Sequence, residues 1–315
     1  MKDKIVLIVG PTASGKTEIS IKLAHKINAE IISADSMQIY KKMNIGTAKP
    51  NIEEMQGIKH YLIDEIEPEE EFSVALFKKQ SEFYIANIIK NDKIPLIVGG
   101  TGLYVNSFVQ TLDFTSAKPN EKIRIELENI AKEKGNEVLH NMLIDIDPLS
   151  ADKIHPNNVK RIIRALEIYK TSGIAKSQWD ERSMKNELKY EPILIGLNMD
   201  RKLLYNRINL RVDIMINNGL VDEVKRLLEE GYAETLVSMQ GLGYKEIVKY
   251  LNGYYSLEEA IEIIKRDTRR FAKRQLTWFR RDNRINWFFT DEYENKDKIL
   301  VDILKILEEK GINSI

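Results

Sequence analysis

An octapeptide close to the N-terminus constrains the fold of this chain more than any other segment. Gly10–Thr17 reads GPTASGKT and matches the GxxxxGK[ST] pattern of phosphate-binding loops. The apolar run Ile5–Val9 before it predicts a buried parallel strand, and Glu18–Ala24 after it has the spacing of an amphipathic helix. A glycine-containing turn that matched by chance would lack this context. The sequence therefore predicts a site for a phosphorylated ligand.

The residue types of this loop suit phosphate binding. Glycines let the backbone curl so that its N–H groups point inward, and the helix N-terminus adds positive potential. Lys16 supplies a point charge, and the hydroxyl of Thr17 is placed to hold Mg²⁺. The predicted phosphate-binding set is Gly10, Thr12, Ala13, Ser14, Gly15, Lys16 and Thr17.

The first part of the chain alternates apolar runs with helical patterns, which is typical of a parallel sheet with helices on its faces. The predicted elements are strands at Glu30–Ser33, Ile94–Val98, Pro192–Leu197 and Asn286–Phe289, and helices at Val74–Lys90, Glu121–Lys134, Val159–Tyr169, Leu203–Asn217, Val221–Glu230, Tyr244–Leu251 and Leu257–Arg281. The long gap before the third of these strands holds only helical patterns. We therefore predict an α/β fold, a P-loop parallel sheet with flanking helices formed by residues 1–114 and 187–315, and a helical insertion domain at residues 115–186.

Composition excludes several classes of protein. The absence of cysteine excludes disulfides, thiolate catalysis and cysteine-based zinc modules, and four scattered histidines do not suggest a metal cage. No apolar stretch approaches the length that crosses a bilayer, and no signal-peptide pattern is present. We expect a cytoplasmic, monomeric protein with no membrane partner.

The charge distribution is uneven although 48 basic residues balance 48 acidic ones. Between Lys265 and Arg284 the chain has nine basic residues and only Asp267 and Asp282 as acids. So one-sided an excess favours a polyanionic partner over a merely solvated helix face. Inside the predicted insertion, Lys160, Arg161 and Arg164 lie at helical spacing and add a second basic surface, and both surfaces suit RNA phosphates.

Asp35 follows the apolar pair Ile31-Ile32, where a predicted strand ends. Ligands of parallel α/β sheets bind beyond the carboxyl ends of the strands, so this carboxylate lies close to the predicted phosphate site. It is suited to accept a proton from a group that attacks the phosphorylated ligand. A cap or turn at Asp35 is an equally open interpretation.

Thr101 lies in the glycine-rich segment Gly99–Tyr104, which follows another predicted strand. Its hydroxyl could donate to a leaving phosphate oxygen or to the acceptor, with a tight turn as the alternative. The same strand ends in Gly99-Gly100 where a P-loop ATPase would carry a Mg²⁺-binding aspartate. ATP hydrolysis is therefore disfavoured.

Several longer segments resemble the bacterial tRNA dimethylallyltransferases, also called tRNA isopentenyltransferases, and the resemblance covers nearly the whole chain. It is carried by GPTASGKT at 10–17, ISADSMQIYKKMNIGTAKP at 32–50, GGTGLY at 99–104, KRIIRALEIY at 160–169, GLGYKE at 241–246 and AKRQLTWFR at 272–280. Many nucleotide-binding proteins share the first segment, whereas the second and the last are far more specific. Tyr61 and Asn158 depart from the family pattern, which has a histidine and an aspartate there.

The resemblance implies transfer of a dimethylallyl group from dimethylallyl diphosphate to N6 of adenosine 37, next to the anticodon of tRNA. The phosphate loop would hold the diphosphate, and Mg²⁺ at Thr17 would help to neutralise the departing charge. Asp35 would act as general base and Thr101 would assist, with the adenosine flipped into the protein. The implied tRNA-binding residues are Asp35, Ser36, Met37, Gln38, Thr101, Arg124, Lys160, Arg161, Ile162, Ile163, Arg164, Gln240, Gly241, Leu242, Gly243, Tyr244 and Lys245.

Three other functions share parts of this pattern. A small-molecule kinase also has a phosphate loop and a strand-end aspartate. A prenyltransferase of free adenine nucleotides needs the same core without the basic surfaces. An RNA-binding module with a vestigial nucleotide site predicts RNA affinity without transfer.

Overall fold

The computed structural model describes residues 2–111, 120–184 and 187–315 of the chain. The chain divides into two compact units, which we call the core unit (Met1–Val105 with Lys189–Ile315) and the inserted unit (Asn106–Leu188). The insertion boundaries predicted from the sequence, at residues 115 and 186, lie outside the described residues.

A six-stranded sheet with the order β3-β2-β4-β1-β5-β6 forms the centre of the core unit, and all its strand pairs are parallel. The strands are β1 (Lys4–Val9), β2 (Ala29–Ser33), β3 (His60–Tyr61), β4 (Ile94–Gly99), β5 (Glu191–Asn198) and β6 (Asn286–Phe289). The central strand β1 pairs with β4 and β5, and Leu7 lies opposite Ile97 and Leu194. Residues Ile5–Val9 are fully buried, as expected for a strand covered on both faces. The predicted parallel sheet is confirmed, including the late strand beside β1.

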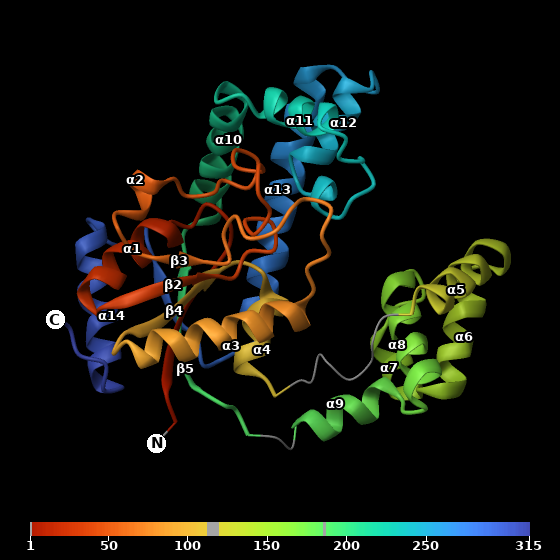
Figure 1. The fold of residues 1–315 in the computed structure, drawn as a ribbon, viewed down its shortest axis with the longest axis horizontal. Helices are drawn as coiled ribbons and strands as arrows, with labels where there is room; N and C mark the ends of the chain where they lie inside the picture. Colours follow the sequence, from red (N-terminus) through yellow and green to blue (C-terminus); the bar gives the residue numbers. More distant parts are fainter. Residues whose placement is uncertain (1, 112–119, 185–186) are drawn as a thin grey trace. The chain divides into compact units, whose positions relative to one another are not determined.

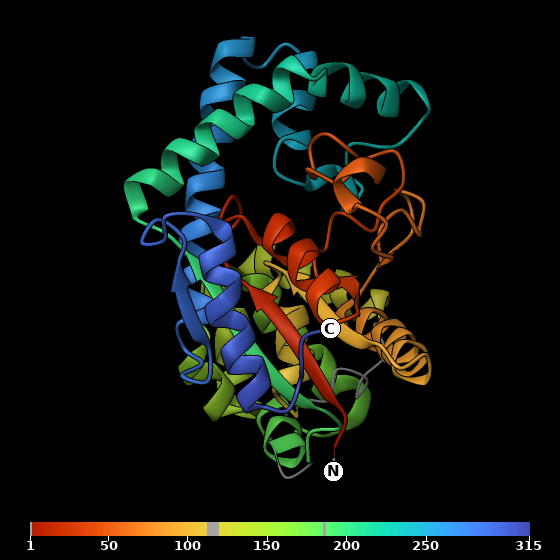
Figure 2. The same cartoon turned by 90° about the vertical axis from the view of Figure 1, so that its left-hand side faces the viewer.

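Helices cover this sheet, and the core unit continues beyond β5 in a mainly helical segment (Figure 1). The helices are α1 (Lys16–Lys26), α2 (Ile52–Met55), α3 (Val74–Lys90), α4 (Gly102–Val109), α10 (Arg201–Asn217), α11 (Leu220–Glu229), the short 3₁₀ helix η1 (Ser238–Gln240), α12 (Tyr244–Leu251), α13 (Leu257–Phe279) and α14 (Lys296–Glu309). One hydrophobic cluster joins β1 with α1 and α14, and Figure 2 shows the dark blue α14 beside the red β1.

Strand β3 and the helices α2, α4, η1 and α14 are absent from the sequence prediction. In α14 the buried Ile299, Ile303 and Leu307 lie at helical spacing, and the Asn295 side chain caps the helix by accepting from two backbone N–H groups. That signal was present in the sequence. Strand β3 has only two residues, so no periodicity can reveal it.

The inserted unit consists of helices in the described residues. They are α5 (Glu121–Lys134), α6 (Asn136–Ile146), α7 (Pro148–Lys153), α8 (Val159–Ser172) and α9 (Lys176–Met184), and the second half of α4, from Asn106, precedes them. Leu127, Leu139, Leu143 and Leu166 form their shared hydrophobic core. The helical patterns predicted at 121–134 and 159–169 correspond to α5 and α8, whereas α6, α7 and α9 were not predicted. Across the described parts of both units, every helix is too short or too polar to cross a membrane.

Truncation of Ile303 in α14 tests whether this helix completes the core. Ile303 is fully buried, so Ile303→Ala is expected to lower the free energy of unfolding by about 2–5 kcal/mol. Val301 on the same helix is 52% exposed, and Val301→Ala should change it by less than about 0.5 kcal/mol. Chemical denaturation followed by circular dichroism measures both. Equal effects of the two substitutions would contradict the packing of α14 described above.

Candidate active site

The phosphate loop adopts a curled backbone between β1 and α1. Gly10, Ala13 and Gly15 have positive φ angles of 151°, 64° and 90°. A Cβ atom at Gly10 would lie 2.3 Å from the carbonyl oxygen of Leu197 in β5, so only glycine fits beside this strand. Gly15 is the N-cap of α1, and the loop therefore leads its amides into a helix N-terminus, which favours anions.

Lys16 and Arg211 place positive charge beside this loop. The Lys16 Nζ donates to the carbonyl oxygens of Gly10 (3.1 Å) and Pro11 (2.8 Å). Burial lowers the pKa of Lys16 to about 8, the charge of Arg211 acts in the same direction, and Asp35 opposes them. Burial also lowers the pKa of Arg211, which has no ion-pair partner among the described residues. Lys16 and Arg211 carry like charges that repel each other, and such a pair forms a site suited to a polyanion.

Arg211 was not predicted from the sequence. It lies on α10, whose buried residues are Leu204, Ile208 and Val212. Because Arg211 follows Ile208 by three residues, it lies on the same buried face of the helix. A cation within an apolar stripe was the signal that could have identified it.

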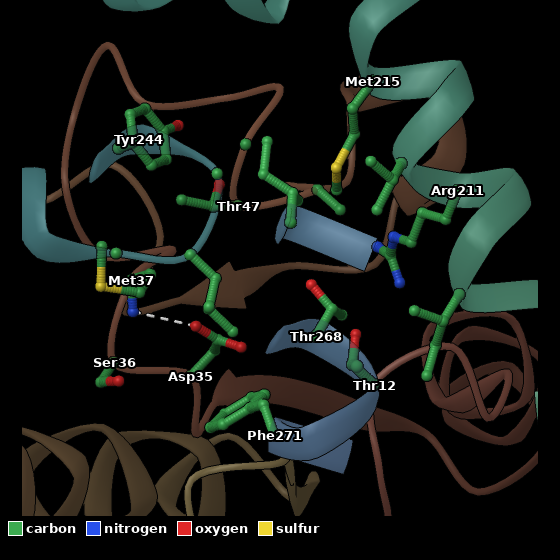
Figure 3. A pocket seen from close by; sticks show the side chains of 18 of the residues that line it. Thr12, Asp35, Ser36, Met37, Thr47, Arg211, Met215, Tyr244, Thr268 and Phe271 are labelled. Carbon is green, nitrogen blue, oxygen red and sulfur yellow. Dashed lines mark hydrogen bonds between the residues drawn. The ribbon is translucent and has the colours of Figure 1, made fainter. Parts of the chain in front are cut away.

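Two cavities, each of about 310 Å³, meet at this point. We call the one that contains Lys16, Thr17 and Gly100 the phosphate cavity, and the one that contains Ser36, Met215 and Tyr244 the acceptor cavity. Six residues line both cavities, namely Thr12, Asp35, Thr47, Ala48, Arg211 and Phe271. Figure 3 shows the acceptor cavity with Asp35, Arg211 and Phe271 around it.

Asp35 follows the carboxyl end of β2, and its carboxylate lies at the junction of the two cavities. Its Oδ1 accepts hydrogen bonds from the backbone N–H of Met37 (2.9 Å, Figure 3) and of Gln38 (3.4 Å). Its Oδ2 has no hydrogen-bond partner in the part of the chain that the structure describes. One oxygen thus fixes the turn while the other is available to a ligand, so the two interpretations of Asp35 are compatible.

Thr101 lies next to Asp35 through contacts between the ends of β2 and β4. Its Oγ1 accepts from the backbone N–H of Ser36 (3.1 Å), and its own N–H donates to the Ala34 carbonyl oxygen (3.2 Å). A Cβ at Gly99 would lie 2.1 Å from that same carbonyl oxygen. The predicted glycine-rich strand end therefore allows the two strand ends to approach each other closely.

Gln275 of α13 links the phosphate loop to this strand end. Its Oε1 accepts from the backbone N–H of Thr12 (2.9 Å), and its Nε2 donates to the Gly100 carbonyl oxygen (2.9 Å). The side chain is 7% exposed. No role for Gln275 was predicted from the sequence, although an amide at the helical spacing of the buried Ala272 and Phe279 was a recognisable signal.

The segment after η1 supplies another wall of the acceptor cavity. Gly241–Lys245 line this cavity together with Ser36 and Met37. Gln240 is exposed and outside its lining, and its Nε2 donates to the Glu234 carbonyl oxygen (2.7 Å). Gln38 lines the phosphate cavity, where its amide nitrogen lies 3.3 Å from the carbonyl oxygens of Thr47 and Ala48. The structure therefore gathers most of the predicted core residues around Asp35.

The predicted RNA-binding residues of the inserted unit occupy different environments within it. Arg124 and Arg164 both bind the fully buried carboxylate of Glu167, at 2.8 Å and 2.6 Å. Ile162 and Ile163 are buried in the core of this unit, so their side chains are not on its surface. Lys160 and Arg161 are exposed.

Among the basic residues of α13 and its C-cap Arg280, some pair with acids of the described chain and others do not. Lys265 pairs with Asp213 (2.7 Å), and Arg266 and Arg270 pair with Asp267 (2.9 and 3.2 Å). Lys273 and Arg280 have no ion-pair partner within the described ranges. Together with Arg201 they line a surface pocket of about 380 Å³, which we call the cationic groove.

The model of the IPP transferase family matches residues 38–282. The chain is 54% identical to a tRNA dimethylallyltransferase of Acetivibrio thermocellus over 310 residues, which cover 98% of this chain and 99% of that protein. A crystal structure of the tRNA isopentenylpyrophosphate transferase of Bacillus halodurans is similar with a TM-score of 0.74 and 45% identity, covering 98% of this chain and 97% of that one. The structure of a eukaryotic dimethylallyltransferase acting on tRNA is similar with a TM-score of 0.75 and 32% identity, covering 88% of this chain and 69% of that one.

Removal of either cation tests the electrostatics of the phosphate cavity. Lys16→Met and Arg211→Gln are each expected to weaken the binding of inorganic pyrophosphate by about tenfold to a hundredfold, because a hydrogen bond to a charged group contributes about 1.5–3 kcal/mol. Isothermal titration calorimetry measures the Kd. The matched control is Arg226→Gln, since Arg226 is 57% exposed on α11 and outside both cavity linings. An unchanged Kd in both test variants would exclude this cavity as the diphosphate site.

Proposed function

The chain belongs to the IPP transferase family, and from this premise we propose that it transfers a dimethylallyl group from dimethylallyl diphosphate to N6 of adenosine 37 in tRNA. The observation that supports this most strongly is the meeting of the two cavities at Asp35. The phosphate cavity offers cations and loop amides for the diphosphate. The acceptor cavity offers apolar side chains and backbone groups, which suit an adenine ring.

The proposed reaction is a direct displacement. The N6 nitrogen attacks the allylic carbon of the donor, the bond from that carbon to the diphosphate oxygen breaks, and diphosphate leaves. The N6 proton passes to Asp35 Oδ2, the oxygen without a hydrogen bond among the described residues. An exocyclic adenine amine is barely basic, so the carboxylate must act as the new bond forms.

Thr101 has a narrower role in this proposal. Its Oγ1 accepts the Ser36 N–H and lies 3.5 Å from the Ser36 Oγ. The hydroxyl proton can therefore point either to Ser36 or to a ligand. We assign it to the leaving diphosphate oxygen or the adenine, as a hydrogen-bond donor.

Magnesium fits the donor set of the phosphate cavity. The described residues contain no cluster of three acidic, histidine or cysteine side chains that could hold a metal ion. Thr17 lines this cavity, and Mg²⁺ commonly takes its remaining ligands from phosphate and water. Thr17 would thus be the protein ligand of a Mg²⁺ ion that, when bound, neutralises charge on the departing diphosphate.

The acceptor is proposed to be the anticodon stem-loop, with its adenosine flipped into the acceptor cavity. Ser36, Met37 and Gly241–Lys245 would hold the base, and the cationic groove would bind RNA phosphates. Neither a prenyltransferase of free nucleotides nor a small-molecule kinase needs this cationic groove. The relatives named for tRNA support the same choice.

Transfer is tested with labelled dimethylallyl diphosphate, Mg²⁺ and an unmodified anticodon stem-loop, followed by mass analysis of the nucleosides. N6-Dimethylallyladenosine is the expected product. A stem-loop with inosine at the target position lacks the amine and should remain unlabelled. Label transferred to free AMP but not to RNA would favour the nucleotide prenyltransferase, and phosphoryl transfer from ATP would favour a kinase.

Asp35→Asn tests the general base without changing the size of the side chain. The single-turnover rate is expected to fall about 10²- to 10⁴-fold, because the amide cannot accept the N6 proton. The Kd for the stem-loop should change by less than about threefold, since the contacts of Oδ1 with Met37 and Gln38 can persist. Rapid-quench kinetics and fluorescence anisotropy measure the two quantities. A near-normal single-turnover rate would remove Asp35 from the chemistry.

Neutralisation of the cationic groove tests RNA binding. Lys273→Gln and Arg280→Gln are each expected to weaken stem-loop binding and to reduce the slope of log K against log salt by about 1. Arg266→Gln removes the same charge from α13, but Arg266 is paired with Asp267, so its effect should be smaller. Pyrophosphate affinity should not change in any of the three. Equal salt slopes for the wild type and all variants would exclude the groove from the RNA site.

A further inference from the structure

Glu223 of α11 is a buried carboxylate held only by neutral donors. Its side chain is 3% exposed, and its oxygens accept from the backbone N–H groups of Asn44 (2.9 Å), Ile45 (2.8 Å) and Gly46 (3.1 Å). They also accept from the Tyr244 hydroxyl (2.7 Å). No ion pair of Glu223 occurs in the described residues. A buried charge is costly without such partners, so this set of donors is specific.

The nearby cation does not neutralise this carboxylate. Lys49 is buried, and burial lowers its pKa while the charges of Asp64 and Glu223 act in the opposite direction. Its Nζ forms its ion pair with Asp64 and not with Glu223. It also donates to the Tyr40 carbonyl oxygen (2.7 Å) and to the Asn44 side chain (2.9 Å). The segment 44–49 is therefore held at one end by Glu223 and at the other by Lys49.

Both groups of donors belong to walls of the acceptor cavity. Gly46, Thr47 and Tyr244 line this cavity, and Figure 3 shows Thr47 and Tyr244 on the same side of it. The Tyr244 ring packs so closely on Gly46 that a Cβ there would lie 2.4 Å from the ring. A second contact of this kind joins Gly241 to Met37, where the Cβ would lie 2.5 Å from the methionine methyl group. Glu223 thus joins two chain segments that are far apart in the sequence.

We propose that Glu223 is a positioning residue for the acceptor, which fixes the Asn44–Gly46 backbone and Tyr244 relative to each other so that the acceptor cavity fits an adenine. The inference rests on the proposed function and extends it to a residue outside both cavity linings. Glu223 acts through Tyr244 and the 44–46 backbone and does not itself touch the reacting atoms.

Two substitutions separate this role from general stability. In Glu223→Gln one acceptor oxygen becomes an NH₂ donor that faces N–H or O–H donors, so at least one buried donor loses its partner. Burial and the Glu223 charge raise the pKa of Tyr244, which keeps its hydroxyl protonated as a donor. Tyr244→Phe therefore removes one hydrogen bond from the set and retains the ring on Gly46.

The matched control is Glu30 on β2 of the same unit. Glu30 is 7% exposed and accepts from the Tyr61 hydroxyl (2.6 Å) and the Lys93 Nζ (2.7 Å). It lies outside both cavity linings. Glu30→Gln thus disturbs a buried carboxylate and a tyrosine without disturbing the acceptor cavity.

The test measures KM for the stem-loop, Kd for inorganic pyrophosphate and Tm in the full-length protein. Glu223→Gln is expected to raise the KM for RNA about tenfold or more, with Tyr244→Phe changing it less in the same direction. The pyrophosphate Kd should stay within about twofold in both. Glu30→Gln should lower the Tm without changing either constant.

The possible outcomes distinguish a positioning role of Glu223 from a purely structural one. A lower Tm in Glu223→Gln with an unchanged KM for RNA would overturn the positioning role, and so would an equal loss of RNA and pyrophosphate affinity. If Glu223→Gln does not fold, Tyr244→Phe decides by the same comparison of constants. A wild-type protein that binds pyrophosphate but transfers nothing to RNA would instead overturn the proposed function and, with it, this inference.

Discussion

Close approach of backbones at the carboxyl ends of neighbouring strands is the constraint on which the site depends. Gly10 lies against the Leu197 carbonyl of β5 and Gly99 against the Ala34 carbonyl that follows β2, and a Cβ at either would lie within 2.3 Å of that backbone oxygen. Gly100 lies against the side chain of Gln275, whose amide nitrogen would be 2.2 Å from a Cβ. These contacts leave no room for a side chain. Because the strand ends converge, Asp35 lies beside the phosphate loop although β4 separates β2 from β1 in the sheet. The chemistry of the site follows from this convergence.

Three carboxylates of the chain illustrate how surroundings define a role. Glu167 is buried beside two arginines and stabilises its own helical unit. Glu223 is buried among neutral donors, all of which belong to one chain segment or to Tyr244, so it holds two walls together. Asp35 is only half-buried, with one oxygen bound by backbone N–H groups and the other available. Of the three, only Asp35 combines a fixed orientation with a free acceptor, which is what a general base requires.

Features that depend on residues close together in the sequence could be predicted, whereas features that depend on contacts between distant segments could not. The phosphate loop, Asp35 and Thr101 each follow a strand directly, so a local pattern and the rule on strand ends were sufficient. Arg211, Gln275 and Glu223 act on segments far away in the chain, and only the packing of α10, α11 and α13 shows which backbone groups they meet. The basic character of α13 was visible, and so was the acid Asp267 that pairs with Arg266 and Arg270, but the pairing of Lys265 depends on Asp213 of another helix.

The phosphate half and the acceptor half of the site differ in the same way, one being formed mainly by a local segment and the other by segments far apart in the chain. The phosphate half is built from one continuous segment with an added cation, and its motif occurs in many nucleotide-binding proteins. The acceptor half combines the 35–48 segment, Gly241–Lys245 and α13, held together by Glu223 and by glycine contacts. The family match over residues 38–282 begins after the phosphate loop and includes most of this acceptor half. The acceptor half therefore distinguishes this site from other phosphate-loop sites, because a phosphate loop binds phosphates in many contexts whereas this cavity requires all three segments in register.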